Sequence, residues 1–281
     1  MFWKRKTLPM LALSALAALS ISCVPVFSGG DGGVDFQKKK NLSYVPAAWP
    51  KNLKGDLYLP ETGAGKAPVV LLIHGDARMG TDGRWHLAGI AQKLARRGYA
   101  VFNITYRMAP EWEYPAPLDD ARMATAWLHD HADEYGIDPE RIGVWGYSAG
   151  GYVGLLTSMT AEPGEFQAAV AGASPTNLMY YSGGQLIQNF LGGRFEDIPE
   201  KYWEASPVNY VTADSPPVFF YHGEDDLLVN PDHLWEMSGK LDESGVPNEV
   251  YWIRKKGHVR AFFDPDGAID QAIDFLDLYL K

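Results

Sequence analysis

Short, continuously apolar segments alternate with amphipathic helical segments along this chain from about Asn41 onward. The segment Pro68–Ile73 contains no polar side chain, which is typical of a strand buried on both faces of a sheet. Strands that alternate with helices must be joined by crossover connections, so neighbouring strands run parallel and helices cover both faces. The pattern therefore predicts one α/β domain built on a mainly parallel sheet.

The apolar runs predict eight strands, and no helical segment separates the first two, which predicts an antiparallel entry into the sheet. Helical spacing of apolar residues predicts helices over Leu87–Arg97, Leu118–His131 and Ala268–Leu280. The segment 174–215 separates two core strands and is the expected position of a cap. The predicted strands are Leu42–Val45, Asp56–Leu59, Val69–Ile73, Ala100–Tyr106, Arg141–Gly146, Ala168–Gly172, Val218–His222 and Glu249–Ile253.

Composition excludes several classes of protein. Because 46% of the 281 residues are apolar, the chain can fill a sizeable core, so disorder is excluded as its overall state. A single cysteine cannot form an internal disulfide. The net charge of −10 argues against nucleic acid or an anionic membrane surface as the main partner.

The N-terminus has the pattern of an export signal. Lys4, Arg5 and Lys6 precede an apolar run over Leu8–Ile21, which is shorter than the roughly 20 residues that span a bilayer. An uncleaved anchor is the alternative. Loss of residues 1–22 as a signal peptide would remove these three cations and change the net charge from −10 to −13.

Cys23 gives that signal a more specific form. The segment Leu19–Cys23 resembles a bacterial lipobox, in which the cysteine is lipidated and becomes the new N-terminus, although Ser20 stands where leucine is usual. The alternative is ordinary cleavage nearby. We therefore expect a lipidated Cys23 with a glycine-rich flexible tether over residues 23–40, and a folded domain over residues 41–281. The protein would be exported and lipid-anchored to the inner or outer membrane of a bacterial cell.

The segment Gly146-Tyr147-Ser148-Ala149-Gly150 indicates nucleophilic chemistry. It contains Gly-x-Ser-x-Gly between an apolar strand and a helix that begins near Ala149. A nucleophilic serine must project from a sharp, strained turn, and flanking glycines allow the close packing that such a turn requires. Free N–H groups at the start of the following helix favour developing negative charge. Ser148 is the predicted nucleophile.

A serine hydroxyl requires a base, and the base must be oriented by an acid. In this type of sheet the chain order is serine, acid, histidine. His258 follows the last predicted strand and is the predicted base, since His222 has no strand-end acid before it and His233 lies within a predicted helix. The loop after Val218–His222 offers three adjacent carboxylates as the acid, Glu224, Asp225 and Asp226.

Acyl transfer also requires N–H donors that stabilise an oxyanion. The backbone of Ala149 supplies one donor, and the loop after Val69–Ile73, which contains Asp76 and Ala77, is expected to supply the other. A routine strand-to-helix connection is the alternative for that loop. The predicted substrate contacts are Tyr147, Tyr180, Tyr181 and Phe190, although packing within the cap would produce the same pattern. No metal site and no cofactor are expected.

Taken in order, these motifs resemble the α/β-hydrolase superfamily from about Ser43 to Lys281. The resemblance is to the esterase branch that includes hormone-sensitive-lipase-like, feruloyl-esterase-like and kynurenine-formamidase-like enzymes. It implies that Asp226 is the acid and His258 the base. Relatives often have His-Gly-Gly-Gly where this chain has His74-Gly75-Asp76-Ala77. The motifs that carry the resemblance are Asp56–Pro60, His74-Gly75, Tyr106–Glu111, Pro117-x-x-Asp120, Tyr135–Ile142, Gly146–Gly151, Ser206-Pro207, Pro216-Pro217 and His222-Gly223-x-x-Asp226-x-x-Val229.

The resemblance and the residues together predict a serine hydrolase that cleaves small-molecule carboxylic esters, without a cofactor and without a nucleic-acid partner. An amide or formamide hydrolase would use the same residues. A peptidase with the same triad, or a binding protein without catalysis on the same scaffold, would also be compatible with this pattern. The membrane is expected as a partner through the lipid anchor alone.

Overall fold

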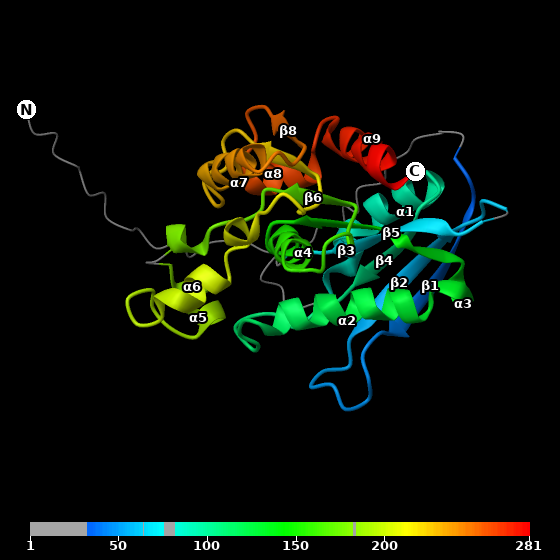
Figure 1. The fold of residues 1–281 in the computed structure, drawn as a ribbon, viewed down its shortest axis with the longest axis horizontal. Coiled ribbons are helices and arrows are strands. Elements are labelled where there is room, and N and C mark those ends of the chain that lie inside the picture. Colours follow the sequence, from blue (N-terminus) through cyan, green and yellow to red (C-terminus); the bar gives the residue numbers. More distant parts are fainter. Residues whose placement is uncertain (1–32, 64, 76–81, 182–183) are drawn as a thin grey trace, which may run out of the picture.

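The computed structural model describes residues 33–63, 65–75, 82–181 and 184–281. Within these residues eight strands form a single sheet in the order β1-β2-β4-β3-β5-β6-β7-β8 (Figure 1). β1 pairs with β2, and β2 with β4, in antiparallel fashion; all other pairs are parallel. The strands are β1 (Phe36–Ser43), β2 (Lys54–Pro60), β3 (Ala67–Ile73), β4 (Ala100–Ile104), β5 (Ile137–Tyr147), β6 (Ala168–Gly172), β7 (Val218–Gly223) and β8 (Asn248–Ile253).

Both faces of this sheet are covered by helices, as the strand–helix alternation predicts. β3, β4 and β6 are buried along their whole length, which accounts for their continuous apolar sequences. In Figure 1, α1 and α9 lie above the sheet and α2 lies below it. The helices are η1 (Gly83–Leu87), α1 (Ala88–Arg96), α2 (Ala116–Asp130), α3 (Ala132–Tyr135), α4 (Ala149–Met159), η2 (Leu178–Tyr181), α5 (Gln185–Leu191), α6 (Pro199–Glu204), η3 (Pro207–Tyr210), α7 (Asp232–Glu243), α8 (His258–Phe263) and α9 (Ala268–Leu280).

The predicted tether over residues 23–40 extends too far. β1 begins at Phe36, so the folded domain starts before the expected boundary at residue 41, and the first strand is not Leu42–Val45. β1 is an edge strand whose residues 37–41 are exposed, so it lacks the apolar pattern on which the prediction relied. Its antiparallel pairing with β2 is as predicted. Residues 1–22 and Cys23 lie outside the described residues, and no helix among the described ones is long and apolar enough to cross a membrane.

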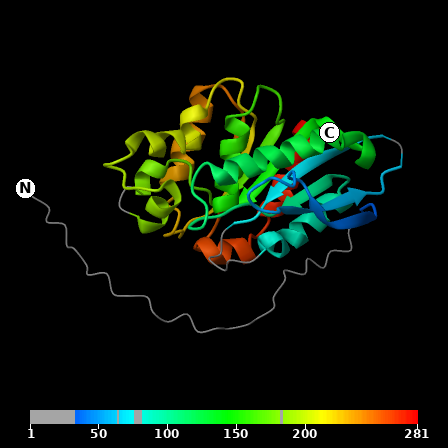
Figure 2. The same ribbon diagram turned by 90° about the horizontal axis from the view of Figure 1, so that it is seen from below.

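The segment between β6 and β7 forms the predicted cap. It contains η2, α5, α6 and η3, which gather at one end of the molecule, while β1 and β2 lie at the opposite end (Figure 2). Tyr114 in the loop before α2 joins this cap, because its backbone N–H donates to Phe190 O at 2.8 Å.

A buried ion pair fixes α2 to the end of β4. The Asp120 carboxylate is fully buried and accepts hydrogen bonds from the Arg107 backbone N–H at 2.7 Å and from its guanidinium. Trp49 Nε1 also donates to Asp120, at 2.8 Å. Because each buried charge is paired and hydrogen-bonded, the burial of this pair is tolerated, and removal of either partner would leave an uncompensated charge.

Candidate active site

Ser148 occupies a sharp turn between β5 and α4. Its backbone has φ 54° and ψ −124°, a left-handed conformation that costs a residue with a side chain about 1–3 kcal/mol. The turn is fixed on both sides, since Ser148 N–H donates to Gly172 O at 2.7 Å and Tyr152 N–H donates to Ser148 O at 2.9 Å. The strained turn predicted from the sequence motif is therefore present.

The two glycines of the motif are required by close backbone contacts. A Cβ at Gly146 would lie 2.3 Å from the Gly150 carbonyl carbon. A Cβ at Gly150 would lie 2.1 Å from Ile73 O, at the end of β3. Only glycine allows α4 to begin this close to β3 and β5, and this close approach places the serine at the carboxyl edge of the sheet.

His258 is the first residue of α8 and faces the serine. Its Nε2 lies 2.9 Å from Ser148 Oγ. Tyr147, the residue before the serine, donates its hydroxyl to His258 O at 2.6 Å and its ring lies 5.2 Å from the imidazole. Tyr147 therefore contacts the backbone and ring of the predicted base.

Asp226 lies on the other side of this imidazole. Its Oδ2 is 2.7 Å from His258 Nδ1, while its Oδ1 accepts the backbone N–H groups of Leu228 and Val229 at 2.9 Å each. Burial alone would raise the pKa of Asp226, but the hydrogen bonds from His258 and from these two N–H groups lower it below its usual value. The carboxylate is thus ionised and fixed against the histidine.

These contacts determine the tautomer of His258. An ionised carboxylate can only accept hydrogen bonds, so Nδ1 carries the ring proton and donates it to Asp226. Nε2 is then left with a lone pair directed at the Ser148 hydroxyl. This arrangement is the one that general-base activation of a serine requires.

Glu224 and Asp225, the other two acidic residues of this loop, lie away from the catalytic histidine. Neither of them contacts His258: Glu224 accepts the Lys255 backbone N–H at 3.2 Å, and Asp225 donates its own N–H to Lys256 O at 3.1 Å. Both residues join the loop that carries Asp226 to the loop that carries His258. Of the three carboxylates, the structure brings Asp226 alone to the histidine.

The sequence-based prediction gives no role to two residues next to the site, Lys256 and His222, and it rejects the second as the base. The Lys256 ammonium is buried and binds Asp266 Oδ1 at 2.6 Å and Asp264 Oδ2 at 2.8 Å. These ion pairs join the chain just before α8 to the chain just after it. His222 Nε2–H donates to Val229 O at 2.9 Å and lies 3.5 Å from Asp226 Oδ2. Burial lowers the pKa of His222, so the ring next to the acid is neutral. The motif His222-Gly223-x-x-Asp226-x-x-Val229 contained the signal for His222.

The predicted oxyanion donors are only partly described. Ala149 is the first residue of α4, where backbone N–H groups have no partner within the helix. Asp76 and Ala77 lie outside the described residues. Gly75, two residues after β3, approaches the serine turn so closely that a Cβ there would lie 2.8 Å from Tyr147 O.

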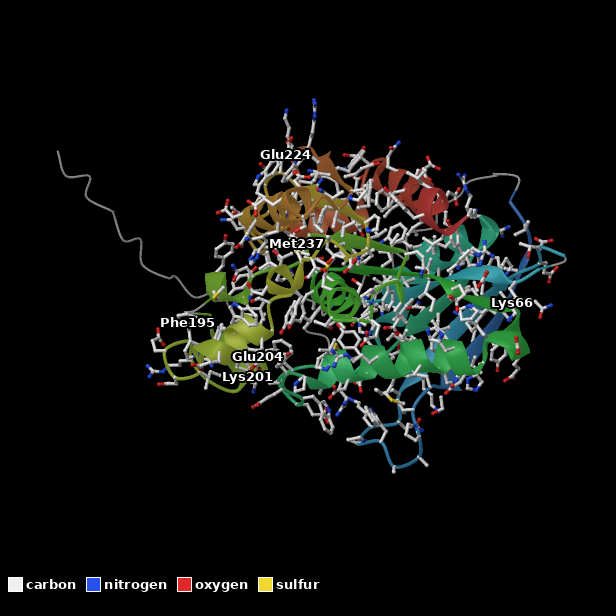
Figure 3. All side chains as sticks on the ribbon, viewed as in Figure 1. Lys66, Phe195, Lys201, Glu204, Glu224 and Met237 are labelled. Carbon is white, nitrogen blue, oxygen red and sulfur yellow. The ribbon has the colours of Figure 1, made fainter. Side chains whose placement is uncertain are left out.

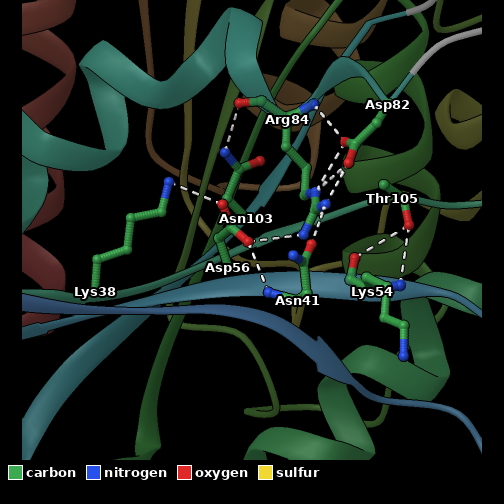
Figure 4. A network of polar contacts seen from close by, with 8 residues as sticks. All are labelled: Lys38, Asn41, Lys54, Asp56, Asp82, Arg84, Asn103 and Thr105. Atoms are coloured by element: carbon green, nitrogen blue, oxygen red, sulfur yellow. Dashed lines mark hydrogen bonds and ion pairs between the residues drawn. The ribbon is translucent and has the colours of Figure 1, made fainter.

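The chain that follows residue 81 is fixed by a network of charged groups (Figure 4). The buried Arg84 guanidinium binds both Asp82 and Asp56, and its Nη2 donates to Asn41 at 2.8 Å. Asn103 on β4 donates to Arg84 O at 2.8 Å. The network attaches η1 to strands β1, β2 and β4.

The predicted substrate-contact residues separate into groups. Tyr180 and Tyr181 pack on the buried ring of His233, at ring distances of 5.0 and 4.9 Å, and Tyr181 donates its hydroxyl to Leu228 O beside the acid. Phe190 instead packs on Tyr152 and Tyr114. The structure therefore places Tyr147 and Tyr181 next to triad residues and Phe190 within the cap.

His233 supports this part of the cap. Its Nδ1 accepts the backbone N–H groups of Thr176 and Asn177, at 3.2 Å each. The ring is fully buried, and burial lowers the pKa of His233 to about 4. Among the described residues, no group of three histidine, cysteine or acidic side chains is arranged to hold a metal ion.

A mainly parallel sheet with a serine at the turn after β5, an acid after β7 and a histidine after β8 defines an α/β-hydrolase fold. A family model described as BD-FAE matches residues 55–241, and the chain belongs to this family.

Named relatives and a solved structure agree with this assignment. "Esterase LipQ" of Mycobacterium tuberculosis is 29% identical over 210 residues, which cover 68% of this chain and 50% of LipQ. "Probable isoprenylcysteine alpha-carbonyl methylesterase ICMEL1" of Arabidopsis thaliana is 28% identical over 83% of this chain and 54% of its own. The chain thus spans about half the length of these curated relatives. A "truncated form of carbohydrate esterase from gut microbiota" superposes with a TM-score of 0.77 at 20% identity, covering 89% of this chain and 98% of that one; this similarity establishes the fold.

Proposed function

We propose that this protein is a serine hydrolase that cleaves carboxylic esters through a covalent acyl-enzyme. The observation that carries the proposal is the continuous hydrogen-bonded chain from Asp226 through His258 to Ser148, with distances of 2.7 and 2.9 Å, at a strained turn. The names of the relatives, which are esterases, support the same chemistry.

The reaction follows from the positions of these groups. Ser148 Oγ attacks the ester carbonyl while His258 Nε2 accepts its proton. Asp226 stabilises the imidazolium that forms, which then protonates the leaving alcohol. Water attacks the acyl-enzyme by the same route and releases the acid, which restores Ser148.

The negative charge that develops on the carbonyl oxygen requires N–H donors. The Ala149 backbone N–H supplies one, and the segment containing Asp76 and Ala77 supplies the second. A backbone N–H survives any substitution except proline, so an oxyanion donor from this segment does not require the His-Gly-Gly-Gly that many relatives have. A carboxylate at position 76 would oppose the developing negative charge if it pointed toward the oxyanion.

The surface next to the triad favours a substrate with an apolar group. Leu228 lies two residues after Asp226 in the sequence, and Val259 directly follows His258. Both side chains are more than half exposed. Tyr147, Tyr180, Tyr181 and Phe190 are the proposed contacts for an acyl or aryl group of a small-molecule ester. An amide or formamide hydrolase would use the same triad, and it is the alternative that a substrate panel separates.

The proposed test is labelling with a fluorophosphonate probe. Wild type and the control Ser244→Ala, at the end of α7, should label equally, whereas Ser148→Ala should not label, because the probe reacts only with an activated serine. Hydrolysis of short-chain, aryl and acetylated-sugar esters, compared with matched amides, then defines the substrate. Equal labelling of Ser148→Ala would overturn the assignment of the nucleophile, and absence of labelling of the wild type would favour a binding protein on this scaffold.

We further propose that the protein is exported and lipid-anchored to a bacterial membrane through Cys23, with residues 1–22 removed. Support comes from the basic start, the short apolar run and the small residues before Cys23. Wild type should partition with membranes and Cys23→Ser should not. Equal partitioning of the two would contradict lipidation.

A further inference from the structure

A cavity of about 670 Å³ lies between the beginning of α2 and the cap helix α6, away from the triad. Thr160 closes the C-terminal end of α4 and lines this cavity, whereas Ser148 precedes the N-terminal end of the same helix. At a rise of 1.5 Å per residue the two residues are about 18 Å apart along the helix. The cavity is lined by Tyr114, Pro115, Leu118, Asp119, Arg122, Thr160, Ile198, Glu200, Lys201, Glu204 and Tyr210.

Two tyrosines provide a fixed aromatic surface in this cavity. Tyr114 and Tyr210 both donate their hydroxyls to the same acceptor, Glu204 O, at 3.3 and 2.8 Å. Leu118 and Ile198 add aliphatic surface beside them. Since the two phenols are already fixed, a ligand that packs against their rings would not need to order them on binding.

The charged groups that line the cavity are largely unpaired. Arg122 donates one hydrogen bond to Thr160 Oγ1 at 3.1 Å, and within the described residues it forms no ion pair. The carboxylates of Asp119, Glu200 and Glu204 likewise have no hydrogen-bond or ion-pair partner in the described part of the chain. Burial raises the pKa of Asp119, although Arg107 and Arg122 act in the opposite direction.

Charge decides which ligands fit. The three carboxylates oppose an anionic ligand, and the guanidinium of Arg122 offsets part of their attraction for a cationic one. Lys201 lies 3.7 Å from Glu113 and is partly neutralised by it. An entirely apolar ligand would cover the charged groups without replacing their water, which is costly.

A neutral sugar meets all of these conditions. Its hydroxyls donate to carboxylates and accept from a guanidinium, while the C–H groups of its ring face pack on the fixed phenols. Lys201 and Glu204 lie on the side of the cap that faces the beginning of α2 (Figure 3), so polar groups from α2 and from α6 are available on both sides of such a ligand.

We propose that this cavity is a second binding site, which holds a neutral saccharide unit of an oligosaccharide at the end of α4 opposite the nucleophile. An acylated oligosaccharide bound there would be retained near the triad while its ester is cleaved. The binding itself does not depend on ester hydrolysis, so the two proposals can fail separately.

Binding is tested by calorimetric titration of the full chain carrying Ser148→Ala with xylohexaose, cellohexaose and mannohexaose. At least one of the three should bind. Arg122→Gln and Asp119→Asn should each weaken that binding about tenfold, as expected for the loss of a charged hydrogen bond. The matched controls Arg254→Gln and Asp35→Asn, which are exposed and lie outside the cavity, should bind as the parent does.

Two further measurements and one replacement variant make the result decisive. Urea unfolding shows whether each variant is folded, and the exposed Glu204→Gln replaces any variant that is not. Enzyme whose Ser148 carries a phosphonate should bind the oligosaccharide as Ser148→Ala does, because the site lies apart from the triad. Absence of binding to all three oligosaccharides, equal binding by folded cavity variants, or loss of binding on phosphonate labelling would each overturn the proposal.

Discussion

Replacement of Asp226 by asparagine should reverse the tautomer of the catalytic histidine. Oδ1 of Asp226 accepts two backbone N–H groups, from Leu228 and Val229, at 2.9 Å each. An asparagine in this position must keep its carbonyl oxygen there, since an NH₂ group cannot accept those bonds. The NH₂ group then faces His258 Nδ1, where the carboxylate oxygen lies at 2.7 Å in the wild type.

The cost of this change follows from the chemistry of the triad. With an NH₂ donor opposite Nδ1, the ring carries its proton on Nε2, which then cannot accept the proton of Ser148 Oγ at 2.9 Å. In the serine proteases the equivalent change lowers kcat by about 10⁴-fold. That factor corresponds to about 5.5 kcal/mol in the activation free energy.

The assay is hydrolysis of 4-nitrophenyl acetate, with kcat and KM determined separately for Asp226→Asn and for the control Asp225→Asn. We expect kcat to fall by about 10⁴-fold in the first variant with little change in KM, and the second to retain wild-type rates. A kcat for Asp226→Asn within about tenfold of the wild-type value, or an equal loss in Asp225→Asn, would refute this role of the carboxylate.

Three further predictions concern stability, measured by urea unfolding. The pKa of His233 is about 4 in the folded protein and 6.5 in the unfolded chain. Between these pH values only the unfolded chain binds the proton, so the free energy of unfolding falls as the pH falls. Between pH 7 and 4 the wild type should lose about 3 kcal/mol more than His233→Gln, and parallel pH profiles would contradict this. Gly150→Ala should lower the free energy of unfolding by about 3 kcal/mol and abolish phosphonate labelling, because its Cβ would meet Ile73 O at 2.1 Å. Gly239 has open space around it, so Gly239→Ala should be neutral or stabilising. Similar behaviour of the two variants would be inconsistent with the close packing described. Asp120→Ala should cost about 3–5 kcal/mol by leaving Arg107 charged and unpaired, and an unchanged unfolding midpoint would show that the pair contributes little.

Much of the fold could be predicted because its signals are local. The central strands are buried on both faces, so their sequences are continuous apolar runs such as that of β3. β1 was misplaced for the opposite reason, since an exposed edge strand requires no apolar pattern and Lys38, Lys39 and Lys40 resemble a linker. The start of the domain could therefore not be read from hydrophobicity.

The site was predictable to the extent that it follows strand ends. Ser148, the acid loop and His258 each come directly after a strand, and parallel strands bring these ends to one edge. The choice among Glu224, Asp225 and Asp226 rested on family resemblance, because three adjacent carboxylates differ only in where the loop directs them. The cavity beside α6 combines α2, α4 and the cap, and no local pattern indicates how such segments lie against one another.

The lysines of β1 have a consequence for the behaviour of many copies of this chain at high concentration. Lys38 crosses to Asp56 and the Tyr58 ring, and Lys39 lies over the Tyr135 ring, so these cations border the free edge of the sheet. A strand of a second molecule that added to β1 would have to strip water from these ammonium groups and from Lys40. The lysines of β1 thus disfavour pairing of this edge strand with a strand of a second molecule. At high protein concentration the molecules should not associate through this edge.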